Sequence, residues 1–133
     1  MVKLSRRLAA IASHAAASNS VADVGTDHGH IPVWLAENGS AAKITASDIR
    51  KGPLDSAKSF ASENGCAEKI DFILTDGLRG ISPEHDTVII AGMGGETIAD
   101  ILEDAPWTKN GVKLILQPQS KIGGLANWLD NNG

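Results

Sequence analysis

Residues 21–30, V-A-D-V-G-T-D-H-G-H, decide the fold of this chain. An apolar run ends at an acid, and Gly25 and Gly29 then permit a tight turn before a segment with helical spacing. Such a segment is typical of the first strand of an α/β sheet, which delivers a nucleotide-type ligand to the start of a helix. We therefore expect a ligand site at the end of this strand.

The rest of the chain alternates between strand and helix patterns, which predicts βαβ units and a parallel sheet. Right-handed crossovers would place the strands in the order 3-2-1-4-5, giving an α/β, Rossmann-like three-layer sandwich, and we expect the almost wholly apolar fourth strand in its middle. The expected strands cover residues 21–24, 43–47, 70–74, 87–91 and 112–116, and the expected helices cover residues 4–17, 32–38 and 53–63, a segment with Ile98, Ile101 and Leu102, and a segment from Leu125. Pro32 and Pro53 are expected to open their helices, and Gly39 to adopt the left-handed conformation after a helix end.

Composition predicts one globular domain, which we place at residues 1–133. Hydrophobic residues make up 42% of the chain and charged residues 21%, enough of the former for a core. The single cysteine, Cys66, rules out an internal disulfide and favours a reducing compartment such as the cytoplasm. No apolar stretch approaches the roughly 20 residues that a membrane-spanning helix needs, so we expect no membrane function.

The formal net charge of −4 argues against nucleic-acid binding by bulk electrostatics. Two small basic groups, Lys3 with Arg6 and Arg7, and Arg50 with Lys51, are interpreted as solvated surface from the sequence alone.

Acidic residues follow each of the first three expected strands. Asp23 and Asp27 would repel a pyrophosphate but suit a positively charged group such as an amine. Asp48 follows the glycine turn by roughly 20 residues, a position from which a carboxylate accepts hydrogen bonds from ribose hydroxyls. Asp76, beside Gly77, could accept a hydrogen bond from an adenine amino group. The pattern predicts an adenosine-type ligand that carries a positive group.

A nicotinamide-dependent oxidoreductase is one alternative. Its G-x-G-x-x-G fingerprint would need a second glycine where this chain has Asp27, and that departure weighs against it. His28 and His30 alternate, but without a third suitable ligand nearby they are weak evidence for a metal, and we expect none.

Together these motifs resemble the class I S-adenosylmethionine-dependent methyltransferases and, more narrowly, the bacterial tRNA (adenine(22)-N1)-methyltransferase family. The resemblance covers nearly the whole chain. It is carried by L-S-R-R-L at residues 4–8, D-V-G-T-D-H-G-H-I-P at 23–32, D-G-L at 76–78, I-A-G-M-G-G at 90–95 and L-I-L-Q-P at 114–118.

The resemblance implies S-adenosyl-L-methionine as cofactor and methyl transfer to N1 of an adenine in tRNA, at position 22. It implies cofactor contacts by Asp23, Gly25, Thr26, Asp27, Gly29, Asp48, Ile49, Asp76, Gly77, Ala91, Gly92 and Gly94. It implies that the adenine enters beside Met93, to which we assign a catalytic role. From its place in the turn, we expect Asp27 to have a catalytic role too, by favouring the positive charge that passes to the methylated adenine. We expect tRNA contacts by Arg6, Arg7 and His28. The Asn/Asp-Pro-Pro-aromatic motif that many methyltransferases of this fold use for exocyclic amines does not stand at residues 91–94, which disfavours N6 chemistry.

Methyltransferases of this fold normally add an antiparallel pair of strands beside the fifth strand, and the resembled family continues into a helical region thought to help hold tRNA. We therefore expect a C-terminally truncated chain, in which residues 112–117 form an uncovered edge that favours self-association. A cofactor-binding fragment without catalysis is the second alternative.

Overall fold

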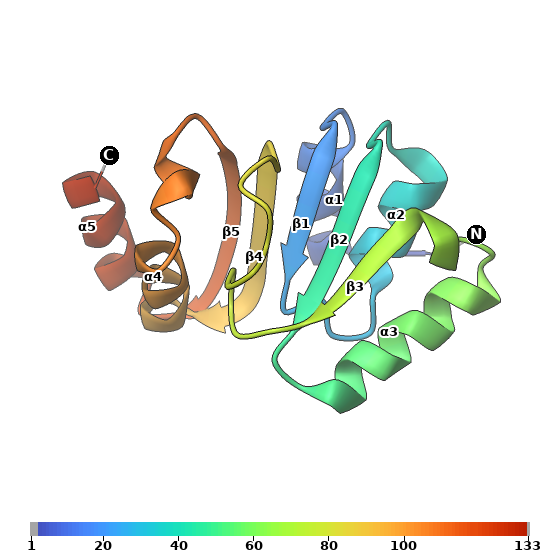
Figure 1. Cartoon of the computed structure of the whole chain (residues 1–133). Helices are drawn as coiled ribbons and strands as arrows, with labels where there is room; N and C mark the ends of the chain where they lie inside the picture. Colours follow the sequence, from blue (N-terminus) through green and yellow to red (C-terminus); the bar gives the residue numbers. More distant parts are fainter. Residues whose placement is uncertain (1–2, 133) are drawn as a thin grey trace.

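The computed structural model describes residues 3–132, and in it five parallel strands form one sheet between two layers of helices (Figure 1). The strands are β1 (Ser20–Val24), β2 (Lys43–Asp48), β3 (Ile70–Leu74), β4 (Thr87–Gly94) and β5 (Lys113–Ser120). They lie in the order β3-β2-β1-β4-β5, so the predicted Rossmann-like topology is confirmed. The middle strand is β1, which is buried along its whole length, and not β4 as predicted.

Helices cover both faces of the sheet. On one face lie α1 (Arg6–Ala15), α2 (His30–Asn38) and α3 (Lys51–Glu63), and on the other lie α4 (Gly95–Glu103) and α5 (Ile122–Asn132). Two short 3-10 turns, η1 (Ala67–Lys69) and η2 (Pro106–Lys109), precede β3 and β5.

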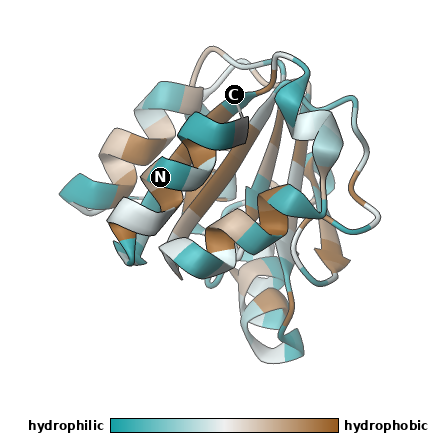
Figure 2. Ribbon diagram, turned by 90° about the vertical axis from the view of Figure 1, so that its left-hand side faces the viewer, coloured by the Kyte–Doolittle hydropathy of each residue, from teal (hydrophilic) through white to brown (hydrophobic). Residues whose placement is uncertain are grey.

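Each face of the sheet has its own hydrophobic core, because alternate side chains of a strand point to opposite faces. Val21 and Ile89 pack under the first helical layer, whereas Ala22, Val88 and Ile90 pack under α4 and α5. Figure 2 shows the hydrophobic residues concentrated on the strands and on the inward sides of the helices. Burial on both faces explains the near-continuous apolar runs of β1 and β4.

Three local predictions were wrong in detail. Pro32 and Pro53 do not open their helices, which begin two residues earlier, at His30 and Lys51. Both prolines still fall in the first turn, where a backbone N–H would have no partner within the helix. Gly39 has extended backbone (φ −89°, ψ 176°) rather than a left-handed conformation, and a Cβ there would lie 2.9 Å from the Leu35 carbonyl oxygen.

The last two strands are longer than predicted. Pairing of β4 with β5 continues beyond Ala91 and Gln117, through two irregularities, to Gly94 and Ser120. Pro118 is tolerated within β5 because this is an edge strand of the described sheet, where a missing N–H donor can face outward.

Within residues 3–132, none of the helices combines the length and the apolar character needed to cross a membrane.

Candidate functional site

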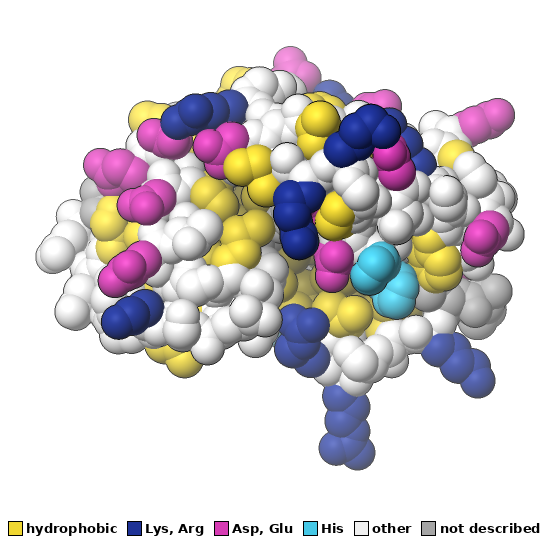
Figure 3. Space-filling model, turned by 90° about the horizontal axis from the view of Figure 1, so that it is seen from below, with side chains coloured by type: hydrophobic (Ala, Val, Ile, Leu, Met, Phe, Trp, Pro, Cys, Tyr) yellow, Lys and Arg dark blue, Asp and Glu magenta, His cyan; other side chains and the backbone are white. Residues whose placement is uncertain are grey.

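A cleft of about 580 Å³ lies where the parallel strands end, around the switch point between β1 and β4. Open α/β sheets bind their ligands at this point, because the connections diverge there to opposite faces of the sheet. Figure 3 looks onto this edge and shows a hollow with hydrophobic side chains in it and basic, acidic and histidine side chains around it.

Most of the predicted site residues line this cleft. They are Arg7, Asp23, Gly25, Thr26, Asp27, His28, Asp48, Ile49, Asp76, Gly77, Ala91, Gly92 and Met93. The fold thus brings together residues from four strand ends and from α1 that are widely separated in the sequence.

Three predicted residues do not line the cleft. A Cβ on Gly29 would lie 2.8 Å from the Ala57 Cβ, so this glycine allows α2 to approach α3. Gly94 ends β4, and a Cβ there would lie 3.0 Å from the Ser120 hydroxyl oxygen. Arg6 is exposed at the start of α1. The first two have packing constraints of their own, independent of any ligand.

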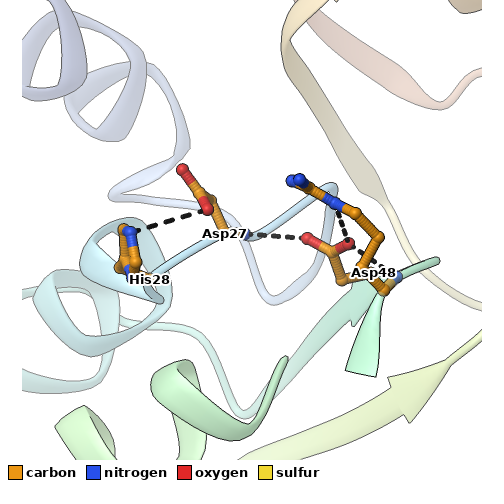
Figure 4. Close-up of polar contacts among 4 residues, drawn as sticks. Asp27, His28 and Asp48 are labelled. Carbon is orange, nitrogen blue, oxygen red and sulfur yellow. Dashed lines mark hydrogen bonds and ion pairs between the residues drawn. The ribbon is translucent and has the colours of Figure 1, made fainter. Parts of the chain in front are cut away.

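The Asp48 carboxylate connects the ends of β1 and β2 (Figure 4). It is only 4% exposed, and it accepts a hydrogen bond from the Asp27 N–H (3.1 Å) and another from the Arg50 N–H (2.9 Å). The Arg50 Nε also lies 3.7 Å from the Asp48 Oδ1. A carboxylate has about four lone-pair positions, so Asp48 retains acceptor capacity toward the cleft.

Asp27 is presented to the cleft by an unusual backbone. Its φ is 55°, a left-handed conformation that asparagine and aspartate adopt more readily than other non-glycine residues. The side chain is 62% exposed, and its Oδ1 lies 3.8 Å from the His28 Nε2 (Figure 4). The turn therefore holds a carboxylate open to a ligand while the backbone of the same residue is anchored to Asp48.

Asp23 lies deeper, and its side chain is buried at the end of β1. The Thr26 hydroxyl donates a hydrogen bond of 2.8 Å to it. Burial nevertheless raises the pKa of this carboxyl from 3.8 to about 7, against the lowering effect of the Thr26 hydrogen bond and with a smaller raising contribution from the charge of Asp48. A positively charged ligand group nearby would relieve this cost.

Gly25 faces Met93 across the cleft. Gly25 has a φ of +71°, and a Cβ at this position would fall within contact of the Met93 Cε, closer than real atoms approach. The Met93 side chain, from the end of β4, thus lies directly against the backbone of the turn after β1.

Sequence reasoning missed several residues of the cleft. Arg50 was interpreted as solvated surface, although its position two residues after Asp48, at a strand end, was a usable signal. Gln117 lies in a quoted motif but received no role, and its side-chain oxygen accepts hydrogen bonds from the Arg7 Nη1 (2.9 Å) and the Gly92 N–H (3.2 Å). Thr97 and Gln119 also line the cleft, and nothing in the sequence pointed to them.

Comparison with known proteins identifies the family of this chain. The model of a family described as "Methyltransferase domain" matches residues 4–133. The tRNA (adenine(22)-N(1))-methyltransferase of Bacillus subtilis is 37% identical over 130 residues, which is 96% of this chain and 55% of that enzyme. The chain thus spans about half the length of this relative.

Solved structures agree with the sequence comparison. The crystal structure of the B. subtilis m1A22 tRNA methyltransferase TrmK superimposes with a TM-score of 0.87 at 36% identity, covering 98% of this chain and 57% of that one. A Streptococcus pneumoniae protein solved in complex with S-adenosyl-L-methionine gives a TM-score of 0.91 at 35% identity, covering 98% of this chain and 63% of that one. A ribosomal protein L11 methylase from Lactobacillus delbrueckii, at 18% identity and a TM-score of 0.78, shares the fold.

We predict that Asp23→Asn stabilises the chain most strongly at neutral and higher pH. Because the folded-state pKa of Asp23 is raised, the native state keeps a proton that the unfolded state releases between about pH 4 and pH 7, and the free energy of unfolding falls as pH rises through that window. Asparagine does not titrate, so the variant does not lose stability in this window. Its free energy of unfolding should exceed that of the unmodified chain by on the order of a few kcal/mol at pH 8 and by little at pH 4, since a pKa difference of one corresponds to about 1.4 kcal/mol. Urea unfolding at both pH values measures this.

The matched control is Asp100→Asn, which removes an exposed carboxylate on α4. It should leave the pH dependence of unfolding unchanged. An Asp23→Asn variant with the same pH slope as the unmodified chain would contradict the assignment of the buried charge.

Proposed function

The chain belongs to the methyltransferase-domain family, and we propose that it binds S-adenosyl-L-methionine in the cleft and transfers the methyl group to N1 of an adenine in tRNA. The observation that carries the proposal is the convergence of Asp23, Asp48 and Asp76, from the ends of β1, β2 and β3, on one cleft. We assign this activity to a single domain, residues 1–133. We also propose a cytoplasmic location, which agrees with tRNA as the substrate.

The residues present fit this cofactor. Its ammonium and sulfonium groups are positive, which suits a cleft with a buried carboxyl of raised pKa at Asp23 and an exposed carboxylate at Asp27. The spare acceptor capacity of Asp48 suits ribose hydroxyls, and the exposed carboxylate of Asp76 suits an adenine amino group. The remaining predicted contacts, from Thr26, Ile49, Gly77, Ala91 and Gly92, lie between these anchors on the same lining.

The same features disfavour a nicotinamide dinucleotide. Its pyrophosphate is doubly negative, and the turn that would have to hold it carries the exposed Asp27 carboxylate in place of a glycine. Repulsion at this position would oppose binding.

The cofactor supplies an electrophilic methyl group, and N1 of a neutral adenine has a lone pair that can accept it without a prior loss of a proton. The chain therefore needs no general base. What its residues must do is hold the base in line beside Met93 and exclude water from the cleft. Precise positioning of this kind can supply much of the rate acceleration.

Asp27 has the best placement for an electrostatic role. Methylation at N1 leaves the adenine ring positively charged, because N1 carries no proton to lose. The Asp27 carboxylate is open to the cleft and held by its own anchored backbone, so it would favour that developing charge. Met93 would contact the base through its apolar thioether.

For tRNA, we propose contacts by the exposed Arg7 and His28, which line the cleft, and by the exposed Arg6 at the start of α1, with position 22 as the target by analogy with the B. subtilis enzyme. Because the net charge of the chain is −4, most of its affinity for RNA would have to come from these few residues or from another protein segment that binds the RNA. We also propose that two chains pair through β5, which is an edge strand among the described residues.

The first test is isothermal titration with S-adenosylhomocysteine, with NAD as the comparison. We expect S-adenosylhomocysteine to bind with a micromolar-range dissociation constant and NAD not to bind. Asp48→Ala should weaken the binding of S-adenosylhomocysteine by at least about tenfold, because a charged hydrogen bond to a ligand contributes roughly 1.5–3 kcal/mol. Asp71→Ala, which removes an exposed carboxylate of β3, is the control and should bind normally. Equal affinity of Asp48→Ala and the unmodified chain would reject the proposed cofactor site.

The second test separates catalysis from binding at Asp27. Asp27→Asn keeps the backbone N–H that bonds Asp48 but loses the charge. We expect the rate of methyl transfer to fall by about tenfold or more, and the affinity for S-adenosylhomocysteine to fall by a clearly smaller factor. Parallel losses in both quantities would mean that Asp27 only binds the cofactor.

The third test addresses pairing through β5. We expect static light scattering to show a dimer whose fraction grows with protein concentration. A monodisperse monomer at high concentration would refute this pairing.

A further inference from the structure

Two strand irregularities face each other at the edge of the cleft. Ala91 pairs with Gln117 and Met93 with Pro118, so Gly92 is an extra residue in β4. Met93 pairs with Pro118 and Gly94 with Ser120, so Gln119 is an extra residue in β5. Bulges of this kind take a residue out of the regular ladder and redirect its side chain, and they are frequent beside active sites.

The bulged residues are in close proximity. A Cβ on Gly92, whose φ is +76°, would lie 3.8 Å from the Gln119 Nε2. Gln119 lines the cleft, and its exposed side-chain amide has no hydrogen-bond partner among residues 3–132. Gln117, two residues earlier, has its amide oxygen engaged by the Arg7 guanidinium and the Gly92 N–H. The structure therefore offers one uncommitted carboxamide near Gly92, on the same cleft lining as Met93.

We propose that Gln119 recognises the acceptor base by pairing with the Hoogsteen edge of the adenine, an inference that rests on the proposed function. When N1 is directed at the methyl group, the edge that remains for recognition carries the N6 amino donor and the N7 acceptor. A carboxamide matches both, because its oxygen accepts from N6 and its NH2 donates to N7. Guanine presents two acceptors on this edge and would leave the amide oxygen unpaired.

Two charged side chains that line the cleft do not offer this combination. The Arg7 guanidinium only donates, and it is already bonded to Gln117. The Asp27 carboxylate only accepts, and its proposed role is to face the charge that develops on the ring. Gln119 is thus a specificity-determining residue for the base. Gln117 is a positioning residue, because its side-chain oxygen holds the N–H of the bulged Gly92.

The test compares two RNA substrates under single-turnover conditions, one with adenosine and one with 7-deazaadenosine at the acceptor position. The second lacks the N7 acceptor but keeps N1. We expect the unmodified chain to prefer adenosine by about tenfold, the discrimination typical of losing one good base contact. Gln119→Ala should lose the preference, mainly through a slower reaction of the adenosine substrate, while its affinity for S-adenosylhomocysteine is unchanged.

Asn127→Ala is the matched control, because it removes an exposed carboxamide from α5. It should retain both the rate and the preference. The melting temperature of each variant establishes that it is folded, and Gln119→Glu, which keeps the acceptor but loses the donor, should also lose the preference.

The outcomes separate the two proposals. If the unmodified chain transfers methyl groups and Gln119→Ala keeps the tenfold preference, the assignment of Gln119 is overturned and the proposed function stands. If the unmodified chain methylates neither RNA, the proposed function fails and the assignment fails with it.

Discussion

The hydrogen bonds of the Asp48 carboxylate are the constraint on which the rest of the site depends. A buried carboxylate must be satisfied, and here the two N–H groups that satisfy it come from Asp27, in the turn after β1, and from Arg50, at the start of the next connection. One side chain thereby fixes the path of the chain at two neighbouring strand ends. The hydrogen bond from the Asp27 N–H to Asp48 also explains how Asp27 keeps a left-handed backbone while its carboxylate lies in the cleft.

The cleft combines this anchored geometry with an unbalanced charge. Four carboxyl groups line it, those of Asp23, Asp27, Asp48 and Asp76. Burial raises the pKa of Asp23, so ionising this carboxyl inside the fold costs free energy. Arg50 offsets part of the charge at the Asp48 end. Such an arrangement is unfavourable for phosphate-rich ligands and favourable for a cationic one, so the electrostatics select the ligand class before any detailed contact is made.

The sequence was sufficient to predict the strand order and most of the cleft, because both follow from local patterns. Apolar runs that end in an acid and a glycine mark β1 and β3, and topology then brings these ends together. The errors arose where tertiary packing overrides local preference. A Cβ on Gly39 would lie 3.4 Å from the Ala16 carbonyl oxygen of another segment, as well as 2.9 Å from the Leu35 carbonyl oxygen, and Gly29 accommodates Ala57. The paired bulges at Gly92 and Gln119 depend on how β4 and β5 align, which neither strand specifies by itself.

The contact from Arg7 through Gln117 to Gly92 has a consequence for how the protein is made. Arg7 and Gln117 are separated by 110 positions in the chain. Their hydrogen bond can therefore form only after nearly all of the described residues have left the ribosome. The carboxylates after β1, β2 and β3 are complete far earlier, by residue 77. The residues of the acid-bearing half of the cleft are therefore synthesised first, and the contact between Arg7 and Gln117, with its high sequence separation, is among the last that can form.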